Sequence, residues 1–264
     1  MVPRIYEQFY AQRVFDIEEV KPLFPDIQQA RNALHYAKTH RYIKRIKGGL
    51  YTVVPFEARA DERAWEAYSP DLFLIGTRVV EPYCFSHGSA LVIYGLVPYR
   101  TARVIITSPK RFHGFTWQET SYVPVHTTDF FGARTSYYKE DLPVQVTDFE
   151  KTFLDCIQRF DLAGGLIGFY RALYRFGFLN PPKVTEYLAR YDSRAFKVRV
   201  GFTLWQMKER WDIPLSLTEP LLDLSTEGGP YHLDPSLPLE LCELDQVWNL
   251  YIPKGFREMS RPVE

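Results

Sequence analysis

The sequence predicts an α+β protein with two domains, a smaller one over residues 1–60 and a larger one over residues 61–264. The chain has 264 residues, 46% of them hydrophobic, which suffices for two hydrophobic cores. Residues 1–60 combine helical periodicity with one β-hairpin pattern. The larger part carries several β-prone runs followed by a helical second half, which is typical of the α+β class.

The smaller domain is expected to begin with two helices separated by a tight turn. Asp16 is suited to cap a helix over residues 17–23, which Phe24-Pro25 ends. Asp26 is suited to cap the second helix, with Gln29 as its partner in a capping box. The apolar stripe of this second helix consists of Ile27, Ala30, Leu34 and Ala37. Residues 42–46 and 50–54 flank a Lys-Gly-Gly turn and predict a β-hairpin.

This order of helix, turn, helix and basic hairpin is that of a winged helix-turn-helix, whose second helix enters the DNA major groove. Six basic residues and one acid lie between Asp26 and Gly49. Arginine pairs with guanine, and asparagine or glutamine with adenine. The expected contacts are Gln28, Gln29, Arg31, Asn32 and His35 near base edges, Lys38 on the same helix face, and Lys44, Arg45 and Lys47 on phosphates. A winged helix that binds proteins instead of DNA is the alternative.

The larger domain begins after a charged connecting segment over residues 55–68. Helices are predicted from Ser69 through Val79, over residues 86–94, from Thr147 through Ile157, and over 166–176, 182–190 and 194–211. Strands are predicted over residues 102–107, 122–125, 135–138 and 143–146. The last fifty residues hold six prolines and are expected to form loops and short strands.

The formal net charge is zero, but it is unevenly distributed. Residues 1–60 carry ten basic and six acidic side chains (+4), residues 61–212 nineteen and seventeen (+2), and residues 213–264 three and nine (−6). The basic first domain supports binding to a polyanion. The acidic end is expected to limit non-specific adhesion to DNA.

The sequence lacks the motifs of the common enzymes and cofactor sites. No HExxH, Walker A, GxGxxG or GxSxG pattern occurs, and the three cysteines have no metal-ligand spacing. We therefore expect no enzyme activity, no catalytic or metal-binding residues and no cofactor. A metal-dependent nuclease around Asp148-Phe149-Glu150-Lys151 is the enzymatic alternative, but these residues are better interpreted as first-turn acids and a solvent lysine. No apolar run is long enough for a membrane helix, so we expect a cytoplasmic protein with no membrane partner.

Several motifs in order resemble the AbiE-type abortive-infection antitoxins, a family of transcriptional regulators. They are the wing Ile43-Lys44-Arg45-Ile46-Lys47-Gly48-Gly49-Leu50-Tyr51; Tyr83-Cys84-Phe85-Ser86-His87-Gly88-Ser89-Ala90-Leu91, similar to the family's Y-x-x-S-H-x-S-A-L; Ile106 to Arg111; Phe130-Phe131-Gly132; Thr147 to Cys156 with Gly164-Gly165; and Tyr231 to Ser236 followed by Trp248. The resemblance covers residues 15–253.

The resemblance implies a DNA-binding autorepressor that recognises inverted repeats in its own promoter, two copies pairing on the DNA. It also implies an antitoxin that counteracts a nucleotidyltransferase-like toxin through the larger domain. The size of that domain and its additional basic residues lead us to expect that it acts by protein or RNA contacts. A stand-alone regulator without a toxin is the alternative within the same family.

Overall fold

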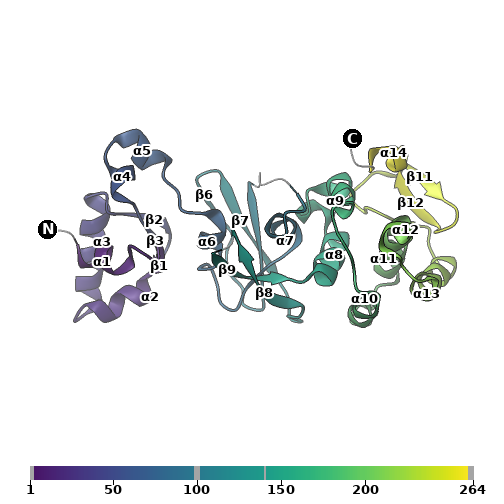
Figure 1. Cartoon of the computed structure of the whole chain (residues 1–264), viewed down its shortest axis with the longest axis horizontal. Helices are drawn as coiled ribbons and strands as arrows, with labels where there is room; N and C mark the ends of the chain where they lie inside the picture. Colours follow the sequence, from purple (N-terminus) through teal and green to yellow (C-terminus); the bar gives the residue numbers. More distant parts are fainter. Residues whose placement is uncertain (1–2, 98–101, 140, 261–264) are drawn as a thin grey trace. The chain divides into compact units, whose positions relative to one another are not determined.

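The computed structural model describes residues 3–97, 102–139 and 141–260 and confirms the α+β class (Figure 1). The chain groups into two compact units. The first comprises residues 1–84, 101–130 and 137–145, and the second 85–100, 131–136 and 146–264. Residue 60 is not a boundary between these units, because the chain remains in the first unit for a further 24 residues. The functional division predicted at residue 60 stays a prediction.

Residues 4–53 form three helices and a three-stranded antiparallel sheet. In chain order the elements are α1 (Arg4–Phe9), β1 (Val14–Asp16), α2 (Ile17–Val20), the 3₁₀ turn η1 (Lys21–Leu23), α3 (Ile27–Thr39), β2 (Ile43–Lys47) and β3 (Leu50–Val53). The strand order is β1-β3-β2, so β2 is an edge strand. The predicted helix-turn-helix and hairpin are present, and α1 and β1 complete a winged helix that the sequence patterns showed only in part.

Two aspartates are the N-caps of helices α2 and α3. Asp16 accepts hydrogen bonds from the backbone N–H groups of Glu18 and Glu19, and the Glu19 carboxylate accepts one from the Asp16 N–H at 2.9 Å, which completes a capping box. Asp26 accepts a bond from the Gln29 N–H at 2.8 Å, but the Gln29 side chain donates to the Asp26 carboxylate at 3.0 Å. The capping box predicted at Asp26 is therefore wrong, because an amide nitrogen bonded to a carboxylate leaves the Asp26 N–H uncapped by that group.

The inner face of α3 packs on the core of the winged helix. Ala30, Leu34 and Ala37 are buried as predicted, but Ile27 is 39% exposed. Ile27 is the first residue of α3, and only the later residues Ala30, Leu34 and Ala37 of this stripe are buried. In the hairpin, a register shift between Arg45 and Lys47 allows both Ile43 and Ile46 to be buried, although strict alternation would place residues three apart on opposite faces.

After the wing, three short helices and a sheet follow. The helices are α4 (Phe56–Arg59), α5 (Glu62–Ala67) and α6 (Leu72–Gly76). The strands are β4 (Cys84–Phe85), β5 (Arg103–Ser108), β6 (Phe115–Trp117), β7 (Thr120–His126), β8 (Ala133–Tyr138) and β9 (Leu142–Thr147). Their order is β6-β7-β5-β4-β9-β8, with β5 parallel and β6 antiparallel to β7. The four predicted strands are present, while β6 was not predicted.

The second unit is mainly helical. Its helices are α7 (His87–Ile93), α8 (Phe149–Gln158), η2 (Phe160–Leu162), α9 (Gly165–Leu173), α10 (Pro181–Leu188), α11 (Arg194–Gln206), α12 (Lys208–Trp211), α13 (Leu215–Thr226), η3 (Leu239–Leu241) and α14 (Phe256–Met259). Strands β10 (Tyr231–His232), β11 (Cys242–Asp245) and β12 (Leu250–Pro253) form a small sheet in the order β10-β12-β11. Their aromatic core includes Phe153, Phe169, Phe202 and Trp248.

Helix α13 corrects the expectation that the last fifty residues hold only loops and short strands. It has twelve residues with Pro220 in its interior, where proline removes a backbone donor. The helix forms because it packs along α11 and buries Leu217 and Leu221. Tertiary burial thus outweighs the local cost of proline.

Candidate nucleic-acid interface

The outer face of α3 presents the polar side chains predicted to read DNA. At about 100° per residue, Gln28, Asn32 and His35 fall within an arc of about 60° on the side opposite the buried stripe. All three are exposed. The Gln28 side-chain amide donates to the side-chain oxygen Oδ1 of Asn32 at 3.0 Å, so the two side-chain amides are oriented relative to each other. Asparagine and glutamine are residue types that pair with base edges, and we call the exposed arc of Gln28, Asn32 and His35 the candidate recognition face.

Gln29 differs from the other predicted base-contacting residues. Two residues along a helix correspond to about 160° of rotation by the shorter way, so Gln29 lies on the flank opposite Arg31. Its side-chain amide is bonded to the Asp26 carboxylate at the start of α3. The structure therefore places Gln29 away from the set formed by its neighbours.

A small hollow lies between α3 and the wing. We call it the wing hollow; its lining residues are Arg31, Leu34, His35, Lys38, Arg45 and Tyr51. Arg31, Lys38 and Arg45 are exposed cations, and no acid is among the described lining residues. The Arg45 guanidinium donates to the Lys47 carbonyl oxygen at 3.3 Å, which directs it along the turn of the wing. The wing hollow therefore concentrates positive charge beside the candidate recognition face.

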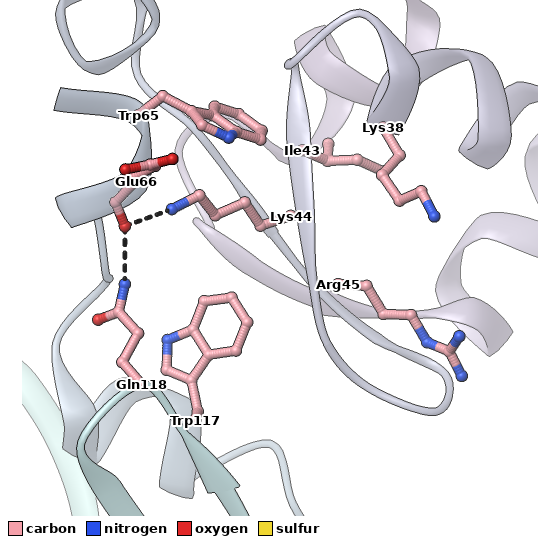
Figure 2. Close-up of a pocket in the computed structure, with 8 residues that line it drawn as sticks. All are labelled: Lys38, Ile43, Lys44, Arg45, Trp65, Glu66, Trp117 and Gln118. Carbon is pink, nitrogen blue, oxygen red and sulfur yellow. Dashed lines mark hydrogen bonds between the residues drawn. The ribbon is translucent and has the colours of Figure 1, made fainter. Parts of the chain in front are cut away.

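The two wing lysines have a different environment from Arg45. Lys44 donates to the carbonyl oxygen of Glu66 at 3.1 Å and lies 5.0 Å from the centroid of the Trp65 ring (Figure 2). It also donates to the carbonyl oxygen of Tyr68 at 3.0 Å. Burial lowers the pKa of Lys44 below its ordinary value, because desolvation outweighs the attraction of Glu66. This ammonium group is bound by its own chain and is not among the groups that line the wing hollow.

Lys47 is held in a similar way at the end of β2. Its ammonium lies 3.4 Å from the Val79 carbonyl oxygen and 5.0 Å from the centroid of the Phe115 ring. Burial lowers its pKa as well. Three wing residues were predicted to contact phosphates. Arg45 lines the wing hollow beside α3, whereas the Lys44 and Lys47 ammonium groups donate to backbone carbonyl oxygens of residues 66, 68 and 79.

A second hollow adjoins the other side of β2, and the sequence analysis did not identify it. We call it the tryptophan hollow; among its lining residues are Lys38, Lys44, Arg45, Trp65, Trp117 and Gln118 (Figure 2). Trp65 comes from α5 and Trp117 from the end of β6, 52 residues later. In the sequence, the two tryptophans were the residues that could have pointed to this hollow, and both are partly exposed in the structure. Their proximity could not be predicted, because it depends on the sheet that brings β6 to the wing.

An exposed aromatic residue on α3 was also missed. Tyr36 is 47% exposed and lies outside the buried stripe. Its ring stacks on that of His40, with the centroids 3.9 Å apart. Helix geometry places Tyr36 about 20° from Gln29, so it adds an exposed aromatic ring on the flank of α3 that Gln29 occupies.

The acids that suggested a nuclease have structural partners. Asp148 is the N-cap of α8 and accepts from the Tyr187 hydroxyl at 2.8 Å and from Lys183 at 3.0 Å. Glu150 accepts from the Asn180 backbone N–H at 2.9 Å. Lys151 is paired with Asp155 and its side chain is 12% exposed, so its interpretation as a solvent lysine is wrong. In residues 3–97, 102–139 and 141–260, no group of three or more His, Cys, Asp or Glu side chains could hold a metal ion.

His87 is buried at the start of α7. It is 3% exposed and has a φ of 49°. Burial lowers its pKa to about 4, and its Nδ1 lies 2.8 Å from the Ser86 hydroxyl. A Cβ on Gly88 would lie 2.7 Å from the Leu162 carbonyl oxygen, so α7 packs too closely there for any other residue. The Ser-His-Gly sequence therefore has a packing role at the start of this helix.

Within the part of the chain that the structure describes, no helix has the length and apolarity needed to cross a membrane.

Comparison with known proteins supports the fold alone. The chain is similar to the crystal structure of RV2827C protein from Mycobacterium tuberculosis, with a TM-score of 0.60 and 12% sequence identity. The match covers 94% of this chain and 89% of that one. No protein-family model and no curated protein matches the chain. The resemblance to AbiE-type antitoxins thus stays a prediction, and the shared architecture is that of an α+β protein over almost its whole length.

Proposed function

We propose that the chain is a sequence-specific DNA-binding transcriptional regulator. The observation that carries the proposal is the outer face of α3, where Gln28, Asn32 and His35 share one exposed arc beside the wing hollow. Amide side chains at such positions bind adenine edges, and the neighbouring arginine binds guanine. The other two cations of the wing hollow, Lys38 and Arg45, suit the phosphates that flank the major groove.

The test is binding to the DNA upstream of the chain's own gene, measured by fluorescence anisotropy against a shuffled duplex of equal length. The wild-type protein is expected to prefer the upstream DNA. Replacement of Asn32 by Ala is expected to remove most of that preference. Gln29→Ala is the matched control, because Gln29 is an exposed amide on the same helix but on the other flank. Equal affinity of the wild type for both duplexes would refute the proposal.

We further propose that the regulator acts as an autorepressor on inverted repeats, in keeping with its resemblance to AbiE-type antitoxins. A two-fold symmetric operator presents two equivalent half-sites about one helical turn apart, so two copies of the chain are required. Footprinting on the upstream DNA is expected to show two protected segments with this spacing. A single protected half-site at saturation would favour a monomeric regulator.

A second candidate function is neutralisation of a nucleotidyltransferase-like toxin through the second unit. The observation that favours it is a stretch of exposed apolar and acidic residues over 239–247, near the end of the chain. The exposed apolar residues there are Leu239 (50%), Leu241 (57%), Leu244 (43%) and Val247 (61%). Glu240 and Glu243 are exposed among them. Such a surface suits a basic protein partner.

The antitoxin proposal is tested by coexpression with a nucleotidyltransferase encoded beside this chain. The full chain is required, since a cut at residue 61 would divide the first unit. Asn32→Ala is expected to protect the cells fully, while the double variant L241E/V247E is expected to lose protection although it remains folded. Full protection by L241E/V247E would exclude this surface as the toxin contact.

A further inference from the structure

The tryptophan hollow is built from the side chains that a nucleotide requires. Trp65 and Trp117 each leave part of the indole exposed, and indole faces stack on nucleobases with roughly 1–3 kcal/mol per base. In Figure 2 the Lys44 side chain lies between the two rings, whereas Lys38 and Arg45 line the hollow from the other side of β2 and extend away from the rings. The hollow therefore offers an aromatic ring and an anionic group two neighbouring sites, on either side of the edge strand β2.

The charge of the tryptophan hollow selects an anion. Lys38, Lys44 and Arg45 supply three positive charges, and Glu66 is the one acid among the described lining residues. Lys38 and Arg45 are exposed and have no acidic partner among the described ion pairs. A phosphate would therefore bind beside these two cations without displacing an existing ion pair.

Hydrogen bonds within the chain hold the wall of the hollow in place. The Trp117 indole N–H donates to the Ser69 hydroxyl at 3.0 Å. The Gln118 amide donates to the carbonyl oxygens of Glu66 at 3.3 Å and Tyr68 at 3.0 Å, and Lys44 donates to the same two carbonyls (Figure 2 shows the bonds to Glu66). The wall is therefore fixed before any ligand binds, which reduces the entropic cost of binding.

We propose that the tryptophan hollow binds a free nucleoside phosphate, with the base against the indoles and the phosphate on Lys38 and Arg45. Duplex DNA does not offer this combination, because its bases are stacked inside the helix and only unpaired bases are free to stack on protein rings. The hollow thus takes a ligand that is chemically related to DNA but distinct from the paired operator.

Occupation of the hollow opposes DNA binding. Lys38 and Arg45 line both the tryptophan hollow and the wing hollow. A phosphate bound to them competes with the DNA backbone for the same two cations, so nucleotide and DNA weaken each other's binding by the same factor. This regulatory step rests on the proposed function, whereas nucleotide binding itself does not.

The test begins with isothermal titration calorimetry of AMP and ATP into the full chain without DNA. We expect one nucleotide site per chain. Trp117→Leu should lower the affinity for the nucleotide at least tenfold, and Trp117→Phe should restore part of that affinity. Trp205→Leu is the matched control, because Trp205 is a partly exposed indole with the Lys208 ammonium 3.7 Å from its centroid, but it lies in the second unit. Inorganic phosphate alone is expected to bind at least tenfold more weakly.

Several results would overturn the proposal. They are the absence of nucleotide binding, equal affinity in the wild type and in a folded Trp117→Leu protein, and tighter binding of a single-stranded oligonucleotide than of any mononucleotide. Lys38→Ala gives a second measure if Trp117→Leu fails to fold, and it is expected to weaken ATP more than AMP. Finally, saturating ATP is expected to weaken DNA binding several-fold. If the chain binds no DNA at all, the proposed function fails while the calorimetric result stands by itself.

Discussion

The contrast between Arg45 and Lys44 permits a quantitative prediction about salt. Neighbouring residues of β2 differ in what their charges contact: Arg45 lines the basic wing hollow, whereas Lys44 donates to two backbone carbonyls. Each phosphate contact contributes about −0.9 to the slope of log K against log salt concentration. On a random duplex, where Arg31 has no cognate guanine and is expected to contact a phosphate as well, Arg31, Lys38 and Arg45 give a slope of about −2.7 for each bound chain, since three contacts contribute about −0.9 each.

Arg45→Ala is therefore expected to reduce the slope to about −1.8. Between 50 and 200 mM KCl, the affinity of the wild type for a random duplex should fall about 40-fold and that of Arg45→Ala about 12-fold. Lys44→Ala is the matched control and should keep the wild-type slope. The assay is fluorescence anisotropy of a labelled duplex at four salt concentrations. An unchanged slope in Arg45→Ala, or an equal reduction in Lys44→Ala, would refute the assignment of these side chains.

Three further predictions concern base reading and stability. Asn32→Ala is expected to cost roughly 1–3 kcal/mol on the preferred DNA and almost nothing on random duplex, as measured by competition binding. Burial lowers the pKa of His87 to about 4, so the folded protein favours the neutral imidazole. The free energy of unfolding should therefore be highest above pH 6.5 and should fall by roughly 3 kcal/mol as the pH approaches 4. Urea unfolding from pH 7 to 4.5 should show this loss, and a His87→Asn protein should show much less of it. A Cβ at Gly201 would lie 2.6 Å from the Trp248 ring, so Gly201→Ala should lower the unfolding free energy by roughly 1–3 kcal/mol. Gly168→Ala, where the space is open, should be neutral or stabilising in the same denaturation experiment.

Local patterns in the sequence were sufficient to predict helix α3. Asp26 begins α3, and the three- and four-residue spacing of Ala30, Leu34 and Ala37 determines its buried face. Because helix geometry fixes the opposite face once the buried one is known, the exposure of Gln28, Asn32 and His35 followed from the pattern alone. Local hydrogen bonding and burial act in the same direction from Ala30 onward, so the buried face was predictable there, whereas the capping box and the burial of Ile27 in the first turn were predicted wrongly.

Contacts between distant segments decided the features that were not predicted. The hairpin was recognisable from its Gly-Gly turn, but the partners of Lys44 are residues 66 and 68. Likewise, β1 has three residues, too few for a periodic pattern, and forms by pairing with β3. The tryptophan hollow combines α5, β2 and β6, so no single window of the sequence contains it.

The acidic end of the chain illustrates how charge and packing are combined in one segment. Residues 213–264 carry the excess of acids, and they also supply Leu221, Trp248 and Phe256 to the core of the second unit. Deletion of this segment would remove core side chains together with charge, and large cavities of this kind cost several kcal/mol. The hypothesis that the acids limit non-specific DNA binding must therefore be addressed by substitutions that keep the core intact. Glu240 and Glu243 are exposed, so glutamine at both positions would remove two negative charges with little effect on packing. The charge hypothesis requires that this variant binds random duplex more tightly than the wild type at low salt. Arg45→Ala should still reduce the slope of log K against log salt concentration by the same amount in this variant.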